Sequence, residues 1–357
     1  MTQLELFKKT ISHEYTGKFL FHCGFIAETF KKFRERYDLP ENISFAEHFG
    51  TYEPWGVHLK PPTTHTLPEH NFTRYFKDME IPPGAFINGL GVLEVPGSVF
   101  HFTRYISPLR NATSVEECRD FPFPDCYGWT DDGMSERVEA AHKNGKVAVM
   151  WVGGQYEPAW QIRGYEEFLM DMIAEPAIPH FILGRLHDQE LRRFIAAAKA
   201  GVDVIHTGDD VATQRALIMH PDLWRRFIKP LQKELNDVAH AINPDVKILY
   251  HSDGDISEII PELIDIGVDI LNPLQPECMD LKWIKREFGK HLIFDGTIGT
   301  QSTMPFGTPD DVRRAVAESK KLYGYDGALM IAPSHILEPE VPPENVMAFL
   351  EECAKEG

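Results

Sequence analysis

Short apolar segments alternate with amphipathic ones along most of this chain. The short runs, dominated by apolar residues, occupy residues 18–21, 146–152, 202–206, 247–250, 268–271, 292–294 and 328–331. Strands that are apolar along their whole length are typical of parallel sheets covered on both faces. Between them apolar residues recur every three or four positions, as at Ile256, Ile259, Ile260 and Leu263, which predicts helices with one buried face. The alternation predicts about eight parallel strands and an α/β fold of the (β/α)8 TIM-barrel type.

The N-terminal third departs from this alternation. Residues 90–95 and 99–105 flank Pro96 and Gly97, which predicts a hairpin. Residues 38–83 are rich in Pro, His, Thr and aromatic residues with weak periodicity, so we expect an irregular segment that covers one end of the barrel. No internal repeat or low-complexity linker divides the chain, and we expect one domain over residues 1–357.

Two helices carry clear boundary signals. Residues 178–200 predict a helix that ends at Gly201, since glycine readily adopts the left-handed conformation found at helix ends. Residues 221–242 predict one long helix with Pro221 in its first turn, where proline is tolerated.

Composition excludes several classes of partner. The chain holds 36 Lys or Arg and 54 Asp or Glu, a formal net charge of −18, which disfavours nucleic acid and anionic membranes as partners. No apolar run approaches the roughly 20 residues of a spanning helix. The first residues lack the apolar stretch of a signal peptide, and the five cysteines include no C-x-x-C pair, so we expect a cytoplasmic protein.

Polar side chains follow the late strands, where a parallel barrel gathers functional groups. His251 and Asp253 lie two residues apart at one strand end and can therefore face the same ligand. Imidazole and carboxylate suit Zn²⁺ or another divalent metal, and His335, at another strand end, supplies a third candidate ligand. Hydrogen bonds to the loop backbone are the alternative explanation for these residues.

Other strand ends offer candidates for catalysis and substrate binding. Asp209 and Asp210 follow the strand at 202–206, where one carboxylate suits acid–base chemistry or substrate orientation while the other caps the next turn. An ordinary capping pair is the alternative. Gln155 and Tyr156 follow two glycines at the end of another strand, where a tight turn would explain the same residues. The remaining pocket candidates at strand ends are Asn272, Gln275 and Asp295.

Two common catalytic motifs are missing. The sequence has no G-x-S-x-G, which argues against a serine hydrolase, and no G-x-x-x-x-G-K-[ST], which argues against nucleotide-dependent phosphoryl transfer.

Several segments together resemble the uroporphyrinogen decarboxylase superfamily. They are YHSDGDI at 250–256, IGVDILNPLQP at 266–276, GTPDDVR at 307–313 and APSHIL at 332–337. The resemblance covers about residues 85–357 and implies a barrel fold. One branch of this superfamily decarboxylates uroporphyrinogen without a cofactor. The other contains zinc-dependent methyltransferases that pass a methyl group to or from a corrinoid protein.

The chain departs from both branches. Decarboxylases carry an N-terminal arginine-rich motif, as a polycarboxylate substrate requires, whereas residues 19–25 here contain no arginine. His335 does match a histidine near the C-terminus of the decarboxylases. The methyltransferases typically hold zinc with H-x-C and a later cysteine. Here His251 matches the histidine, Asp253 replaces the first cysteine and His335 the second, which implies a harder metal site and a stronger Lewis acid.

The resemblance favours a methyltransferase that moves a methyl group from a small O- or N-methylated substrate to a corrinoid protein, with cobalamin carried by that partner. In this interpretation His251, Asp253 and His335 bind the metal, and Asp209 and His335 are catalytic. The substrate-binding candidates are Gln155, Tyr156, Asp210, Gln275 and Asp295. A homodimer is expected from the resemblance alone. The alternatives are a cofactor-free decarboxylase or lyase that uses His335 with an aspartate, and a non-catalytic binding protein.

Overall fold

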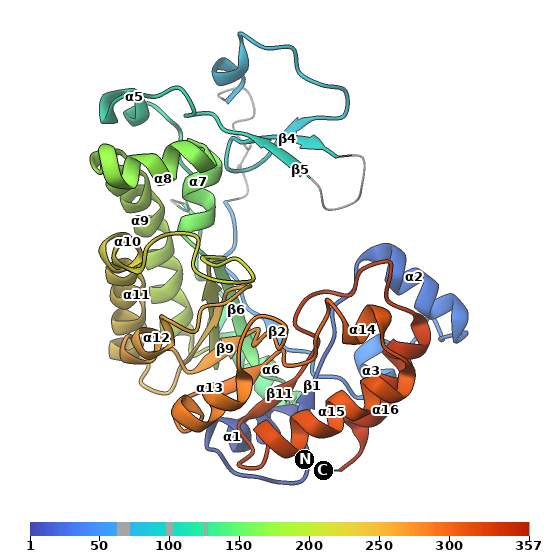
Figure 1. Ribbon diagram of the computed structural model, residues 1–357. Helices are drawn as coiled ribbons and strands as arrows, with labels where there is room; N and C mark the ends of the chain where they lie inside the picture. The colour runs from blue at the N-terminus through green and yellow to red at the C-terminus, as the bar shows by residue number, and fades with distance from the viewer. Residues whose placement is uncertain (63–71, 98–102, 125, 127, 357) are drawn as a thin grey trace.

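The computed structural model describes residues 1–62, 72–97, 103–124, 126 and 128–356. Its main feature is a curled sheet of eight parallel strands with helices packed around the outside (Figure 1). In spatial order the strands are β1 (Leu20–Phe21), β11 (Leu329–Ile331), β10 (Ile293–Asp295), β9 (Ile270–Asn272), β8 (Lys247–His251), β7 (Val204–Gly208), β6 (Ala148–Gly153) and β2 (Trp55–Gly56). The Tyr52 amide donates a hydrogen bond of 2.7 Å to Phe21 O and links the two ends of this sheet. The predicted TIM-barrel-like α/β fold is confirmed.

Helices surround the sheet, and from β6 onward they alternate with the strands as predicted. They are α1 (Gln3–Ile11), α2 (Ala27–Arg36), α3 (Phe45–Phe49), the 3₁₀ helix η1 (Thr73–Phe76), α5 (Val115–Arg119), α6 (Met134–Lys143), α7 (Tyr156–Arg163), α8 (Tyr165–Ala174), α9 (Ala177–Ala200), α10 (Pro221–Phe227), α11 (Lys229–Ile242), α12 (Ile260–Asp265), α13 (Leu281–Phe288), α14 (Thr303–Phe306), α15 (Pro309–Tyr323) and α16 (Pro343–Ala354). As predicted, α9 ends at Gly201, whose φ is +81°. The long helix predicted over 221–242 is instead two helices that meet at Ile228, because Pro230 cannot continue the hydrogen bonding of α10.

The N-terminal third holds one barrel strand that the sequence pattern missed. Strand β2 lies within residues 38–83, which were predicted to be irregular, and so do α3 and η1. Residues 63–71 of that segment lie outside the described residues. The predicted hairpin is confirmed by the antiparallel sheet of β3 (Phe86–Ile87), β4 (Leu93–Pro96) and β5 (Thr103–Ile106), although residues 98–102 are not described. This small sheet stands beyond α7 at the top of Figure 1.

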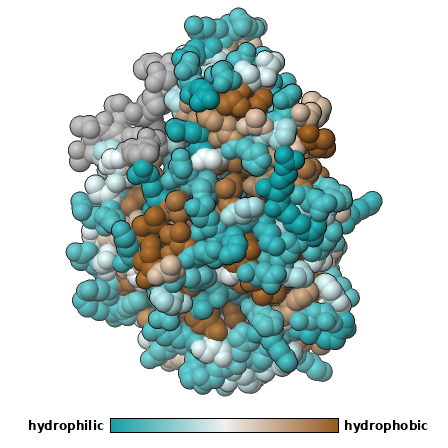
Figure 2. Space-filling model, turned by 90° about the vertical axis from the view of Figure 1, so that its left-hand side faces the viewer, coloured by the Kyte–Doolittle hydropathy of each residue, from teal (hydrophilic) through white to brown (hydrophobic). Residues whose placement is uncertain are grey.

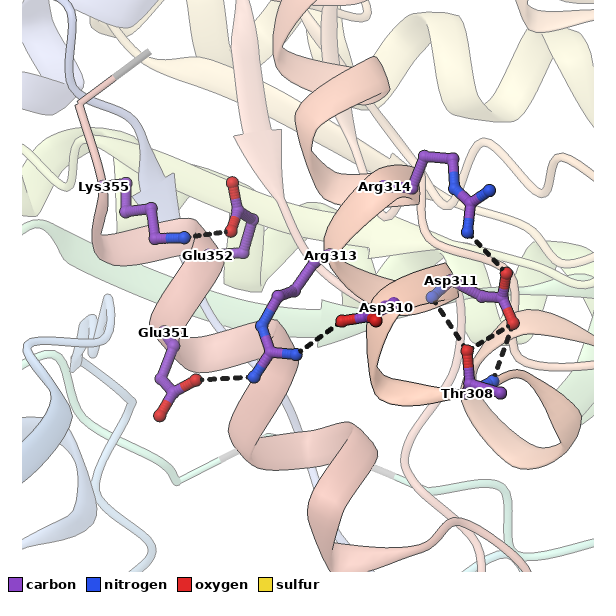
Figure 3. Close-up of polar contacts among 8 residues, drawn as sticks. All are labelled: Thr308, Asp310, Asp311, Arg313, Arg314, Glu351, Glu352 and Lys355. Carbon is purple, nitrogen blue, oxygen red and sulfur yellow. Dashed lines mark hydrogen bonds and ion pairs between the residues drawn. The ribbon is translucent and has the colours of Figure 1, made fainter.

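The last two helices show how local sequence fixes an element. Thr308 and Asp311 form a reciprocal capping box at the start of α15, in which each side chain accepts from the other residue's amide. Arg313 of α15 donates to Glu351 of α16 at 2.9 Å and joins the two helices at the surface (Figure 3).

The barrel interior is layered. Its lower layer is apolar and comes from alternate strand positions, with Phe7 of α1 packed among them at 1% exposure. Helix α1 lies beside the N-terminal ends of the strands, where the Leu4 amide bonds Gly145 O at 2.9 Å, just before β6. Phe7 therefore closes the floor of the barrel.

The outer surface is mainly polar. On the face shown in Figure 2, hydrophilic side chains dominate and apolar ones form patches between them. None of the described helices is both long and apolar enough to cross a bilayer.

Candidate active site

Three potential metal ligands converge at the C-terminal ends of β7 and β8. The ligand atoms of Asp210, His251 and Asp253 all lie within 4.8 Å of one another. His251 Nε2 is 3.6 Å from Asp210 Oδ1, and the Asp253 amide donates to the same oxygen at 2.8 Å. This metal group combines one imidazole nitrogen with two carboxylates.

A glycine brings the two strand ends together. Gly208, the last residue of β7, has a φ of +141°, and a Cβ there would collide with the backbone O and N of His251. Only glycine permits this approach, since any side chain would meet the backbone of β8. Asp210, two residues later, therefore lies beside His251.

A hydrogen-bonded chain fixes the orientation of the His251 ring. Asn272 Nδ2 donates to Asp295 Oδ2 at 2.9 Å, which turns the amide oxygen of Asn272 towards His251 Nδ1, 2.7 Å away. Because that oxygen can only accept, Nδ1 is the donor in this contact, which leaves Nε2 as the ring nitrogen that faces Asp210. His22 Nε2, 3.0 Å from Asp295 Oδ1, completes the chain. This arrangement is typical of histidines that bind metals.

The electrostatics of the metal group favour a cation. Burial, followed by the charge of Asp210, raises the pKa of Asp253. Burial and then Asp209 and Asp210 raise the pKa of nearby Glu157 to about 7. Asp253 Oδ1 is buried and has no hydrogen-bond partner among the described residues. A divalent ion would satisfy that oxygen and offset the repulsion, so the residues present fit a metal.

The observed group differs from the predicted ligand set in its third member. His335 lies outside the group, with Nδ1 3.1 Å from Ile336 O, and Asp210, predicted to bind substrate, takes its place. His335 instead lines an outer hollow of about 410 Å³ together with Asp253 and Gln275. Gln275 is anchored there, because its Oε1 accepts from the Gly254 amide at 2.5 Å.

Asp209, Gln155 and Tyr156 are engaged in contacts that join the start of α7 to the end of β7 and to α9. The buried Asp209 carboxylate accepts from the amides of Gln155 at 2.8 Å and Glu157 at 2.9 Å. Gln155 Nε2 lies 3.0 Å from His187 Nδ1, while Tyr156 is fully buried. A direct part of these three residues in catalysis or substrate binding stays a prediction.

A second hollow, of about 340 Å³, lies inside the barrel above the apolar floor. Asp295 faces it, together with four side chains that were not predicted as site residues: His22, Tyr52, Trp151 and His206. Trp151 lies two positions after Val149 and His206 two positions after Val204, and both valines face the barrel interior. Because side chains alternate along a strand, this spacing in the sequence could have identified Trp151 and His206 as inward-facing. Burial and then the neighbouring His251 lower the pKa of His206 to about 4, so its ring is neutral at physiological pH.

Comparison with known proteins agrees with this fold. Residues 138–356 match the family model described as Uroporphyrinogen decarboxylase (URO-D). The chain belongs to the uroporphyrinogen decarboxylase family.

The curated relatives of this family member are distant. A uroporphyrinogen decarboxylase from Chlorobium phaeobacteroides is 25% identical over 189 residues, which are 52% of this chain and 51% of that protein. The chain thus spans about half the length of that relative. A second uroporphyrinogen decarboxylase, from Prochlorococcus marinus, is 22% identical over 92% of this chain and 88% of its own length.

A solved structure shares the fold along the whole chain. The methyltransferase from Methanosarcina mazei superposes with a TM-score of 0.64 and 16% identity, covering 99% of this chain and 98% of that protein. At this level of identity the similarity establishes the architecture.

Proposed function

We propose that this member of the uroporphyrinogen decarboxylase family is a metal-dependent methyltransferase that moves a methyl group from a small O- or N-methylated donor to a corrinoid protein. The observation that carries the proposal is the convergence of Asp210, His251 and Asp253 within 4.8 Å. Two carboxylates and an imidazole suit zinc or another divalent ion and leave coordination positions open to a substrate.

Each residue has a defined part in this proposal. His251 offers Nε2, while Asp210 and Asp253 offer carboxylate oxygens. The metal, when bound, polarises the heteroatom that carries the methyl group. The carbon–heteroatom bond would break with its electron pair left on the heteroatom, the methyl group would pass to the corrinoid of the partner, and the released alcohol or amine would take up a proton. His335, in the outer hollow beside Asp253, is placed to supply that proton.

The charges around the site disfavour the alternative of a carboxy-lyase. Among the described residues that line the outer hollow and the barrel hollow, none is lysine or arginine. A polycarboxylate substrate needs such cationic groups. The site instead presents several carboxylates, which fit a metal ion and an uncharged donor.

Metal content tests the proposal most directly. We expect about one divalent metal per chain in protein purified without a metal-binding tag and measured by elemental analysis. His251→Ala should lose the metal, whereas His335→Ala should retain it, because His335 lies outside the group. Asn272→Leu keeps all three ligands but removes the acceptor of Nδ1–H, and should weaken metal affinity about 10- to 100-fold.

Two outcomes would contradict it. Wild-type protein that takes up no zinc, cobalt or manganese after dialysis against each would rule out the metal site. Metal that survives His251→Ala but is lost in His335→Ala would show that the ligands are other than those observed. Methyl transfer is then measured with cob(I)alamin and a panel of methoxylated and methylated amine donors.

A further inference from the structure

The barrel hollow exposes a tryptophan that points inward. Trp151 follows Val149 by two positions on β6, and Val149 belongs to the apolar interior layer, so both side chains face the barrel axis. Val149 is 3% exposed, whereas Trp151 is 41% exposed. So large an aromatic surface left open inside a barrel indicates a ligand-binding wall, since interiors are otherwise closely packed.

Other rings extend this wall around the hollow. The His206 ring lies 6.3 Å from Trp151 on one side and 6.3 Å from His251 on the other. Tyr52, which also lines the hollow, lies 6.1 Å from His22. Below them the floor is apolar and includes Leu249, Ile270 and Met330. The hollow thus combines aromatic sides with an apolar base, which suits a flat apolar ring.

Charge further restricts the ligand. Asp295 is 2% exposed and its two oxygens are already bonded to His22 and Asn272. The second carboxylate at the hollow, Glu53, accepts from Lys146 at 3.0 Å. No described residue that lines the hollow is Lys or Arg. A carboxylated ligand would therefore lose its hydration without gaining a cationic partner, while a cationic ligand would find both carboxylates already bonded.

The hollow is small and adjoins the metal group. Its volume of about 340 Å³ is near the lower end of the roughly 300–1,000 Å³ typical of ligand pockets. Asn272 lines the hollow and bonds His251, so the hollow and the metal group share a wall. A ligand of one ring would fill the hollow and reach this wall with a substituent.

We propose that the barrel hollow binds an uncharged single-ring compound, and that in the proposed reaction this compound is the methyl donor, a methyl ether on the ring. The ring packs against Trp151 and Tyr52. The ether oxygen is directed to the side of the hollow where His206 and Asn272 adjoin His251. The assignment of this ligand as donor rests on the proposed function, but its binding to the hollow does not require the metal.

Binding of three matched compounds by calorimetry tests the proposal. All three contain a dimethoxybenzene ring. The first has no further substituent, the second also carries a carboxylate, and the third also carries an aminomethyl group. We expect the uncharged compound to bind at least tenfold more tightly than the other two. Trp151→Ala should weaken it at least tenfold, whereas Phe306→Ala, at a surface ring that is 77% exposed, should not. Val204→Phe, which fills the floor but keeps Trp151, should also block binding.

The same titrations in His251→Ala separate this proposal from the proposed function. Retained binding of the uncharged ring in that variant, whatever its metal content, supports the hollow as a ligand site. If wild-type protein binds metal but the uncharged ring does not bind, binds no better than the carboxylate or the amine, or binds equally well in both Trp151→Ala and Val204→Phe, the proposal is overturned while the metal site stands.

Discussion

At the scale of single residues, the candidate metal group depends on the turn that follows each strand. His251 and Asp253 were predicted to share a site because they are two apart at a strand end, and they do converge. Asp210, predicted to bind substrate, lies in this group, whereas His335, predicted as the third ligand, lies outside it. The reason is physical: a strand end fixes where a loop starts, but the turn after it decides where the side chain points. For Asp210 that turn depends on the contact of Gly208 with β8, which no local pattern reveals.

A buried glutamate on α9 gives a prediction about pH. Burial is the main cause that raises the pKa of Glu190 from 4.5 to about 8, although Arg193 lies 3.6 Å away. Between pH 4.5 and 8 the folded state therefore keeps a proton on Glu190 that the unfolded state has released. The contribution of Glu190 to the free energy of unfolding is therefore fully present below pH 4.5. It should fall by about 1.4 kcal/mol per pH unit as the pH rises towards 8.

Glu190→Gln should remove this dependence. Thermal unfolding between pH 5 and 8 should show a smaller decrease in Tm for this variant than for the wild type. Glu139→Gln, at a surface ion pair of α6, should follow the wild-type curve. Parallel curves for Glu190→Gln and wild type would show that Glu190 is ionised in the folded protein.

At the scale of elements, periodicity predicted the central and C-terminal helices and strands well. It failed where an element is too short to show a period or is interrupted by proline. Strand β2 has two residues, one of them a glycine, and is defined by its pairing with β6. The division between α10 and α11 arises because Pro230 lacks the amide hydrogen that a continuous helix needs.

The contact between β7 and β8 gives the prediction at this scale. Gly208→Ala forces an unfavourable φ and a collision with the His251 backbone, so we expect a loss of roughly 1–3 kcal/mol in the free energy of unfolding. Because His251 must move, metal binding should fall in the same variant. Urea denaturation and metal titration measure the two effects.

Helix α9 offers a matched control. A methyl group added at Gly184 would meet no heavy atom within 4 Å beyond the backbone of its own helix, and Gly184→Ala should leave stability unchanged or raise it by up to about 1 kcal/mol. Equal stability and metal affinity in the Gly208→Ala and wild-type proteins would mean that β7 and β8 tolerate a side chain between them.

At the scale of the whole molecule, the alternation of strands and helices was enough to predict the barrel. It could not predict how the barrel is filled, because that depends on side chains far apart in the chain. Six strands or their immediate flanks supply the polar and aromatic lining of the barrel hollow, and a seventh, β8, supplies His251 behind Asn272. The lining residues are His22, Tyr52, Trp151, His206, Asn272 and Asp295, and only the assembled sheet brings them together.

Phe7 provides the prediction at this scale. It is 1% exposed and separates the barrel hollow from a second hollow beneath the strands, since it lines both. Phe7→Ala should lower the free energy of unfolding by about 3–5 kcal/mol, and Phe7→Leu by less. Urea denaturation measures both. A change below about 1 kcal/mol for Phe7→Ala would show that α1 is not needed to close the floor.

A closed floor also sets the order of events. With Phe7 at the bottom, a donor in the barrel hollow has to enter and leave at the C-terminal ends of the strands, beside Asp210 and His251. A corrinoid protein that collects the methyl group would have to dock over that same opening. In the proposed reaction the donor would have to arrive before the partner docks, and the demethylated product would have to wait until the partner departs. The steady-state kinetics of such an enzyme would be compulsorily ordered, with excess corrinoid protein inhibiting turnover by trapping the product.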